Sequence, residues 1–179
     1  MTKFVFDNTI LSHFARANRL GALQVITEDD ECVVPIEVFG EIVRGENLYP
    51  ELESLESRLH WMRRVELEDI REIVRFARYK GELGGGPTEN MGESAALAWA
   101  SHNSAVAIID EVPARTLGDS EGIECHGSLW LLLRAFNAGA LDRVTLENIL
   151  DDLLKTDMRL PINSGAEIVA WGYKEGLLT

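Results

Sequence analysis

The stretch SAVAIIDEVPAR, residues Ser104–Arg115, decides the fold of this chain. An apolar run, Ala105–Ile109, leads directly into two acids, Asp110 and Glu111, and then into a proline. A short run that is rich in β-branched residues and followed by turn formers predicts a buried strand. Because an unpaired carboxylate at the end of a buried strand is costly, we expect Asp110 to face a group that stabilises its charge.

Predicted strands and helices alternate on either side of this stretch. Further strands are predicted at residues 3–7 (KFVFD), 31–35 (ECVVP), 61–67 (WMRRVEL) and 121–127 (EGIECHG). Helices are predicted at residues 9–26 with a break near Gly21, and at 36–45, 68–82, 93–103, 128–139, 145–155 and 164–174. Strands separated by helices predict an α/β fold, a three-layer α/β/α sandwich around a mainly parallel sheet of about four or five strands.

The length of 179 residues is typical of one domain, which we place at 1–179. We expect the C-terminal helices, within residues 144–179, to pack on that domain or to extend it. The sequence has no internal repeat and no low-complexity tract. The glycine-rich stretch LGGGPTENMG, residues 83–92, predicts a loop rather than a linker between domains.

The composition limits the classes of function. A hydrophobic content of 46% and a charged content of 26% are typical of a globular protein. The net charge of −13 argues against non-specific binding of nucleic acid over the whole surface, and it suits either a basic partner protein or a high-salt cytoplasm. We expect Cys32 and Cys125 to be reduced thiols. We find neither a signal peptide nor a membrane span, and we expect a cytoplasmic location.

Four acids are candidates for one site. Asp7 and Asp110 each follow a predicted strand, and parallel strands bring their carboxyl ends to the same edge of the sheet, where ligands bind. Glu41 lies one helical turn after Glu37 on a polar helix face, and Glu93 opens another helix. Carboxylates that are brought together repel one another unless a cation holds them. Oxygen ligands of this kind suit Mg²⁺ or Mn²⁺.

Each acid also has a structural explanation when it is taken alone. Asp7 is well placed to cap the following helix, and Asp110 to cap the turn into VPAR. Glu41 fits a solvated helix face, and Glu93 fits a first turn where the helix dipole favours negative charge. The combination of all four acids in this order is what points to a metal site.

These residues resemble the PIN-domain nucleases over nearly the whole chain. FVFDNTILSHFARANRL is similar to the family's opening strand, acid and hydroxyl residue, and VVPIEVFGEIVRG to its second acidic motif. MGESAALAWA is similar to its Gly-Glu helix start, and AIIDEVPARTLGDSEGIECHGSLWLLLRAFNAG to its fourth acidic strand end. The tail LLKTDMRLPINSGAEIVAWG is similar to the closing helices of the toxin-like bacterial and archaeal branch. Glu111 stands where that branch often has a second Asp.

The resemblance implies metal-dependent hydrolysis of RNA by the toxin of a toxin–antitoxin pair, with a basic antitoxin and a homodimer. Asp7 and Asp110 would coordinate the metal directly, and Glu41 and Glu93 would complete the set of ligands. Supporting residues would be Thr9, Glu111 and Ser128. Thr9 equally fits a cap of the first helix, and Ser128 is expected to be an N-cap.

Candidate phosphate ligands are arginines and a lysine around the expected site. Arg115 follows the last acid, and a surface ion pair is an equal alternative for it. Arg78 and Lys80, with Arg75, precede the glycine-rich loop, where they also suit a helix C-terminus. RLHWMRR adds three arginines and Trp61, which is either a stacking platform or a core residue.

Two other functions remain open at this point. A phosphatase of the haloacid dehalogenase type would use Asp7 as its nucleophile, but that family needs a second Asp at the place of Thr9. A PIN scaffold without catalysis would serve as an RNA- or protein-binding regulator, although all four acids are intact.

Overall fold

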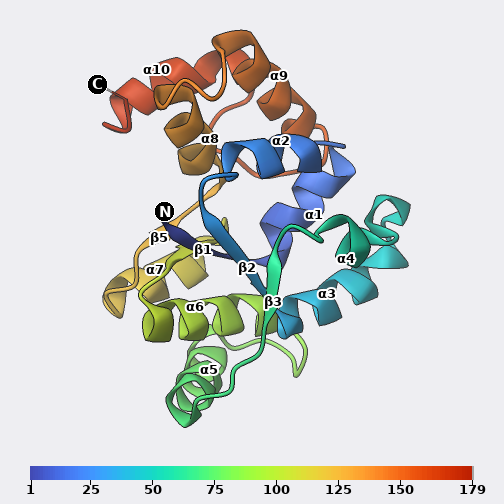
Figure 1. Ribbon diagram of the computed structural model, residues 1–179, viewed down its shortest axis with the longest axis vertical. Coiled ribbons are helices and arrows are strands. Elements are labelled where there is room, and N and C mark those ends of the chain that lie inside the picture. The colour runs from blue at the N-terminus through green and yellow to red at the C-terminus, as the bar shows by residue number, and fades with distance from the viewer. Residues whose placement is uncertain (179) are drawn as a thin grey trace.

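A sheet of five parallel strands forms the centre of the protein (Figure 1). The computed structural model describes residues 1–178. Its strands are β1 (Lys3–Phe6), β2 (Glu31–Pro35), β3 (Arg63–Val65), β4 (Val106–Ile108) and β5 (Cys125–His126). They lie in the order β3-β2-β1-β4-β5, and every neighbouring pair is parallel. The predicted α/β class and parallel sheet are confirmed.

The order of the strands places a reversal of the chain at the centre of the sheet. The chain runs outward from β1 through β2 to β3, and then returns to β4 on the other side of β1. Ligands bind at such reversals, beyond the carboxyl ends of the strands. Phe6 is aligned with Ile108 across the pair β1–β4, so Asp7 and Asp110 leave the sheet at the same edge.

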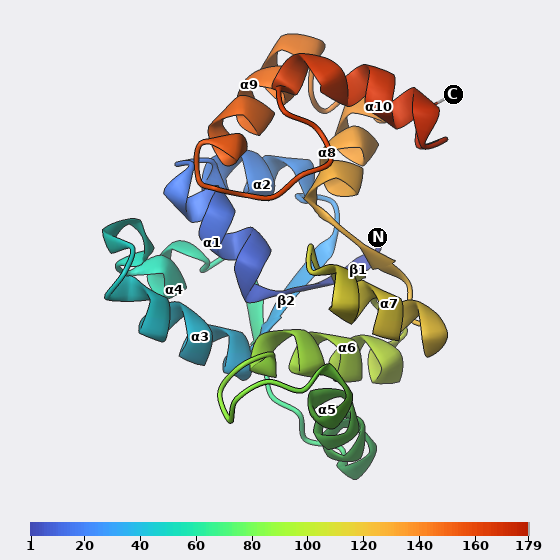
Figure 2. The same cartoon turned by 180° about the vertical axis from the view of Figure 1, so that it is seen from behind.

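Helices cover both faces of the sheet (Figures 1 and 2). One face carries α1, α2, α8, α9 and α10, and the other carries α6 and α7 with α5 outside them. The helices are α1 (Asn8–Arg16), α2 (Leu20–Ile26), α3 (Ile36–Glu46), α4 (Leu55–Arg58), α5 (Ile70–Leu83), α6 (Met91–Asn103), α7 (Val112–Ser120), α8 (Ser128–Asn137), α9 (Arg143–Leu154) and α10 (Ile168–Lys174), with short 3₁₀ turns at Pro50–Leu52 and Gly165–Glu167.

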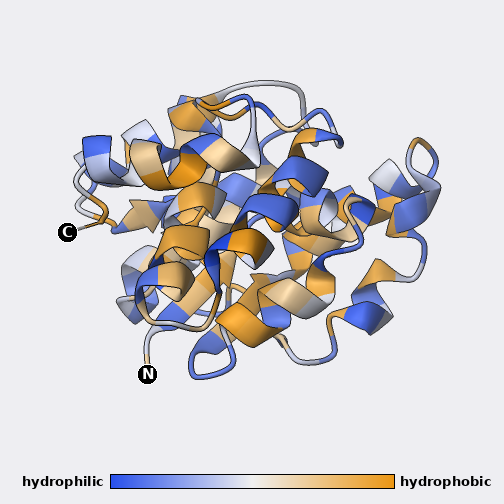
Figure 3. Ribbon diagram, turned by 90° about the horizontal axis from the view of Figure 1, so that it is seen from above, coloured by the Kyte–Doolittle hydropathy of each residue, from blue (hydrophilic) through white to orange (hydrophobic). Residues whose placement is uncertain are grey.

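The side chains of each strand point alternately into two hydrophobic cores, one on each face of the sheet. On β1, Phe4 and Phe6 face the core that contains α1 and α8, whereas Val5 faces the core of α6; all three are fully buried. Successive side chains of a strand point to opposite faces, so a strand that is apolar throughout must be covered on both sides. Figure 3 shows hydrophobic and hydrophilic residues mixed along most helical ribbons, as expected for helices with one side on a core. Helix α6 differs, since residues 92–100 are all buried between the sheet and the outer helices.

Some elements differ from the prediction. The break in the first helical region lies at Asn18, which has a left-handed φ of 55°, and Gly21 is inside α2. Strand β3 is shorter than predicted and ends at Val65. Helix α7 was not predicted because Pro113 and Gly118 argue against a helix; Pro113 lies in the first turn, where proline is tolerated.

The C-terminal helices pack on the layer of α1 and α8. Helix α9 contacts both of these helices, and α10 contacts α8. Leu146, Ile149, Leu150 and Leu153 of α9 are buried in the core of that layer. Of the helices within residues 1–178, none has the length and apolar character needed to cross a membrane.

Candidate functional site

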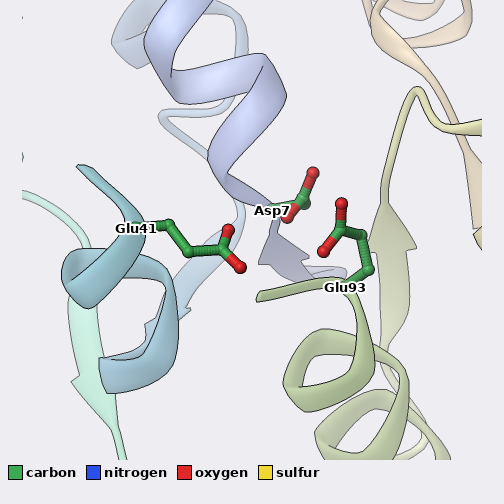
Figure 4. A group of neighbouring side chains, drawn as sticks. All are labelled: Asp7, Glu41 and Glu93. Carbon is green, nitrogen blue, oxygen red and sulfur yellow. The ribbon is translucent and has the colours of Figure 1, made fainter. Parts of the chain in front are cut away.

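Three of the four predicted acids meet at the carboxyl edge of the sheet. Asp7 follows β1, Glu41 lies on α3, and Glu93 lies in the first turn of α6. One carboxylate oxygen from each residue lies within 4.8 Å of the other two. Figure 4 shows the three side chains pointing toward one another from their separate elements. We call Asp7, Glu41 and Glu93 the acidic cluster.

Asp7 serves both as a helix cap and as the buried centre of the acidic cluster. Its Oδ2 accepts a hydrogen bond from the backbone N–H of Thr9 at 3.2 Å, which caps α1. Its Oδ1 is buried and has no hydrogen-bond partner among residues 1–178. Burial, and then the neighbouring carboxylates of Glu93 and Glu41, hold the pKa of Asp7 well above its ordinary value. The capping role therefore uses one oxygen and leaves the other directed into the cluster.

Glu41 links the acidic cluster to the beginning of α6. The residue before this helix, Asn90, has a left-handed conformation and no capping side-chain hydrogen bond. Glu41 Oε1 instead accepts hydrogen bonds from the N–H groups of Met91 at 3.1 Å and Gly92 at 2.9 Å. A carboxylate from α3 thus satisfies donors that a helix start otherwise leaves free.

Gly92 leaves room for the acidic cluster. A Cβ at this position would lie 2.7 Å from Glu41 Oε2 and 3.0 Å from Asp7 Oδ1. Such contacts are closer than van der Waals packing allows, so any other residue here would push the carboxylates apart. The sequence contains this signal, a glycine directly before Glu93, but its steric meaning appears only in the folded protein.

Glu93 is buried and has no partner for one of its oxygens. Its side-chain Oε2 forms no hydrogen bond with any residue in the range 1–178. Burial, and then the nearby carboxylates of Glu41 and Glu111, together raise the pKa of Glu93 to about 7. Without a counter-charge, this arrangement is unfavourable at neutral pH.

The chemistry of the acidic cluster fits a divalent cation. Two buried oxygens without partners and a space that a Cβ would fill are what an ion enclosed by carboxylates requires. Oxygen-only ligands suit Mg²⁺ and Mn²⁺ better than metals that prefer nitrogen or sulfur. A bound cation would also offset the repulsion that helps to raise the pKa values of Asp7 and Glu93.

Asp110, the fourth predicted acid, leaves the sheet at the same edge but is outside the acidic cluster, and the start of α8 holds its carboxylate. Its Oδ1 accepts from the backbone N–H of Ser128 at 2.8 Å, and its Oδ2 accepts from Ser128 Oγ at 2.6 Å. Burial raises the pKa of Asp110, while Ser128 and then Arg115 oppose that rise. Ser128 is not the N-cap that the sequence suggested, because Gly127 occupies that position and the Ser128 hydroxyl binds Asp110.

Glu111 and Thr9 line two hollows, one of which Glu41 also lines. Glu111 is the exposed N-cap residue of α7. A hollow of about 340 Å³ is lined by Thr9, Glu41 and Glu111, and an adjoining hollow of about 370 Å³ by Thr9, Glu111 and Asp110. Of the acids discussed here, Glu41, Asp110 and Glu111 therefore line two neighbouring hollows that share Thr9 and Glu111. A wider hollow of about 820 Å³ lies between α3 and α4 and contains none of the predicted acids.

Two of the three predicted cations have structural roles. Lys80 donates to the carbonyl oxygens of Gly84 at 2.9 Å and Gly86 at 3.0 Å, which closes the end of α5. Arg78 forms an ion pair with Glu121, which follows the end of α7 opposite Glu111. Both side chains are therefore engaged away from the acidic cluster, and their role in binding phosphate stays a prediction.

Arg115 is the predicted cation that stays near the acids. Its Nη1 donates to the carbonyl oxygens of Ile109 at 3.1 Å and of Asp110. This differs from the surface ion pair that was its alternative. Trp61, the candidate stacking platform, is partly buried against the hydrophobic core. Its neighbours Arg63 and Arg64 form ion pairs with Glu31 and Glu56.

A cavity next to Asp110 was missed by the sequence analysis. It measures about 450 Å³, and His126, Trp130 and Arg159 are among its lining residues. These residues are separated in the sequence and form no motif there. Only the packing of the C-terminal segment against β5 and α8 brings them together.

Comparison with known proteins gives a family and a fold. The family model for the PIN domain matches residues 3–170 of the chain. No curated protein matches the sequence. Among solved structures, a chain in the crystal structure of VapBC2 from Rickettsia felis, bound to a DNA fragment from their promoter, has a TM-score of 0.50. The sequences are 11% identical, and the match covers 70% of this chain and 98% of that chain. At this identity the likeness shows the fold alone.

Proposed function

The chain belongs to the PIN-domain family, and from that premise we propose that it is a metal-dependent endoribonuclease, the toxin of a toxin–antitoxin pair. The observation that carries the proposal is the acidic cluster, in which three carboxylates converge within 4.8 Å. Two of their oxygens, Asp7 Oδ1 and Glu93 Oε2, are buried without a partner among residues 1–178. A cluster with only a structural role would satisfy these oxygens internally.

Asp7, Glu41 and Glu93 would hold Mg²⁺ or Mn²⁺. When such an ion is bound, it can lower the pKa of a water and stabilise the charge on a leaving phosphate oxygen. Asp7 offers Oδ1 while its Oδ2 stays on the N–H of Thr9. Glu41 offers Oε2 while its Oε1 stays on the start of α6. The scaffold contacts therefore fix the orientation of the ligand oxygens before any ion binds.

Asp110, Glu111 and Ser128 would complete the site. Both oxygens of Asp110 accept hydrogen bonds from Ser128, so Ser128 sets the orientation of this carboxylate. Carboxylate oxygens have further lone pairs, so Asp110 can still accept from a ligand or an ordered water. Glu111 is exposed at the two hollows and adds negative charge there. Thr9 lines the same hollows and is positioned to contact the substrate.

The substrate would be RNA, and the partner a basic antitoxin. A net charge of −13 disfavours long-range attraction of nucleic acid but suits a basic protein. The structural neighbour VapBC2 was crystallised with a DNA fragment from its promoter. We place the protein in the cytoplasm, where its two free cysteines would remain reduced, and we expect it to form a homodimer.

Cleavage of a single-stranded RNA in the presence of Mg²⁺ or Mn²⁺ tests this function. We expect Asp7→Asn and Glu93→Gln to lose at least about a hundredfold in rate, because each removes a charged ligand. Asp29→Asn is the matched control, since Asp29 is an exposed acid that precedes β2, at the opposite edge of the sheet. Asp29→Asn should cleave like the wild type.

Other outcomes would assign the protein to another class. Tight RNA binding without cleavage under any divalent metal would indicate a scaffold that regulates by binding. Release of phosphate from small esters, with intact RNA, would indicate a phosphatase. Equal cleavage by the wild type and by Asp7→Asn would show that the acidic cluster is not the active site.

A further inference from the structure

A cavity beside Asp110 is not used by the proposed cleavage chemistry. It measures about 450 Å³ and is lined by residues that include Asp110, Arg115, His126, Trp130, Arg159 and Trp171. Most of these residues come from β5, α8 and the C-terminal segment. The volume is within the range of small-molecule sites, roughly 300–1,000 Å³.

The cavity adjoins the hollows that Thr9, Glu41 and Glu111 line. It shares Asp110 and Arg159 with the adjoining hollow of about 370 Å³. That hollow in turn shares Thr9 and Glu111 with the hollow that Glu41 lines. An extended chain that follows these neighbouring hollows past Glu41 can therefore place its next unit in the cavity.

The walls of the cavity are aromatic and fixed. The rings of His126 and Trp130 are stacked with their centroids 3.8 Å apart and their planes at 4°. Trp130 also packs edge-on against Phe4 of β1, with centroids 6.2 Å apart, and Glu124 bonds His126 Nε2 at 2.9 Å. Flat aromatic walls of this kind bind nucleobases of any sequence, because every base has a π-face.

Two arginines supply positive charge in an otherwise acidic protein. Arg115 is fixed by its hydrogen bonds to the carbonyl oxygens of Ile109 and Asp110. Arg159 is exposed at the cavity and forms no ion pair or hydrogen bond with another of residues 1–178. With 30 acids against 17 basic residues, an unengaged arginine beside an aromatic cavity is suited to a phosphate.

We propose that this cavity is a nucleobase subsite for single-stranded RNA, which takes the base next to the bond that lies at the acidic cluster. The base would pack against the aromatic walls that His126, Trp130 and Trp171 provide, and Arg159 would bind the adjoining phosphate. The choice of RNA rests on the proposed function. Aromatic walls with positive charge fit a nucleotide better than they fit a wholly apolar side chain.

Binding without metal tests the subsite separately from catalysis. The probe is a single-stranded RNA of about ten nucleotides with 2′-O-methyl groups, titrated in EDTA. We expect His126→Ala and Arg159→Gln each to weaken binding by roughly five-fold or more. The controls are Tyr173→Ala, an exposed aromatic on α10, and Arg71→Gln, an exposed arginine on α5. Both controls should bind within about two-fold of the wild type, because neither residue lines the cavity.

Two further readouts separate base from phosphate recognition. The wild type and His126→Ala should bind an abasic oligonucleotide of the same length with equal affinity, because that oligonucleotide lacks the base with which His126 would stack. Arg159→Gln should instead lower the slope of log Kd against log salt by roughly 0.7 to 1, whereas His126→Ala should leave that slope unchanged.

Several results would overturn the subsite. If His126→Ala weakened binding of intact and abasic RNA equally, the cavity would not read a base. Wild-type affinity in both variants, with metal-dependent cleavage intact, would refute the subsite and leave the nuclease in place. If RNA failed to bind while an apolar peptide changed the tryptophan fluorescence, the cavity would belong to a protein partner.

Discussion

At the scale of single residues, the site depends on oxygens that the fold leaves without a partner. Asp7 and Glu41 each give one oxygen to a helix start and direct the other toward the acidic cluster. Each of these acids thus satisfies the local rule for a helix end. That structural role still leaves one oxygen for the proposed metal site, because a carboxylate has two oxygens.

Gly92→Ala tests the space between the carboxylates. In an ordinary helix position this change stabilises by about 1 kcal/mol. Here the new Cβ would lie 2.7 Å from Glu41 Oε2 and 3.0 Å from Asp7 Oδ1. We expect cleavage to fall at least ten-fold and stabilisation by Mg²⁺ to be lost, as measured by thermal unfolding. Gly81→Ala is the control, since nothing lies within 4 Å of its Cβ, and wild-type metal binding by Gly92→Ala would contradict the account.

The raised pKa values predict how stability depends on pH without metal. Asp7 and Glu93 favour the protonated form in the folded state, the latter with a pKa of about 7. Their stabilising contribution is therefore present below their ordinary pKa values and is lost as pH rises through the folded ones. His13 acts in the opposite direction, because burial lowers its pKa from 6.5 to about 4, so its contribution is complete only above pH 6.5.

Between pH 6.5 and about pH 8, deprotonation of the acidic cluster should therefore lower stability. We expect the Tm of the metal-free protein to fall by about 2–4 °C in this window, the shift that roughly 1 kcal/mol causes in a domain of this size. Asp7→Asn should flatten the curve. A metal-free Tm that rises through this window would contradict the assignment of the raised pKa values.

At the scale of elements, the sequence predicted the sheet and most helices but not the contact between Glu41 of α3 and the start of α6. Alternation, prolines and glycines indicated β1, β2, β4 and α8 because these signals are local. The cap of α6 could not be predicted from neighbouring residues, because it is Glu41, a residue 50 positions away from Met91. Helix α7 was missed because its Pro113 and Gly118 argue against a helix, although both are tolerated where they lie.

Replacement of Glu41 separates its structural role from its role in the site. Glu41→Gln keeps an oxygen for the N–H groups of Met91 and Gly92, so we expect it to unfold within about 1 kcal/mol of the wild type. Glu41→Ala leaves both donors unsatisfied and should lose about 1–3 kcal/mol in urea unfolding. Stabilisation by Mn²⁺ should be weakened in both variants. Full Mn²⁺ stabilisation in Glu41→Gln would remove this residue from the metal ligands.

At the scale of the whole molecule, exposed apolar residues indicate where two copies of the chain could associate. Several apolar side chains of the early helices are exposed, among them Val25, Val43 and Leu48, of which Leu48 is 75% exposed. Val43 lies on α3 and Leu48 shortly after it, and exposed apolar surface of this kind can mark an interaction site. These residues agree with an interface on the early helices of the expected homodimer.

Sedimentation velocity across a wide range of concentration tests the dimer. We expect Leu48→Asp to shift the protein toward monomer, because a charge would be buried at the interface. Val144→Asp is the control, since Val144 is 67% exposed on α9, away from the early helices. A wild-type protein that stays monomeric at every concentration would refute the dimer.

The most direct test of the acidic cluster as a metal site is anomalous diffraction from crystals soaked in Mn²⁺. We expect a peak among the carboxylate oxygens of Asp7, Glu41 and Glu93, whose oxygens already lie within 4.8 Å of one another. Oxygen ligands of such ions lie at about 2.0–2.2 Å. The same soak of Asp7→Asn crystals should show a weaker peak or none. Saturating Mn²⁺ that gives no peak at this cluster, or a peak only elsewhere, would contradict the central claim.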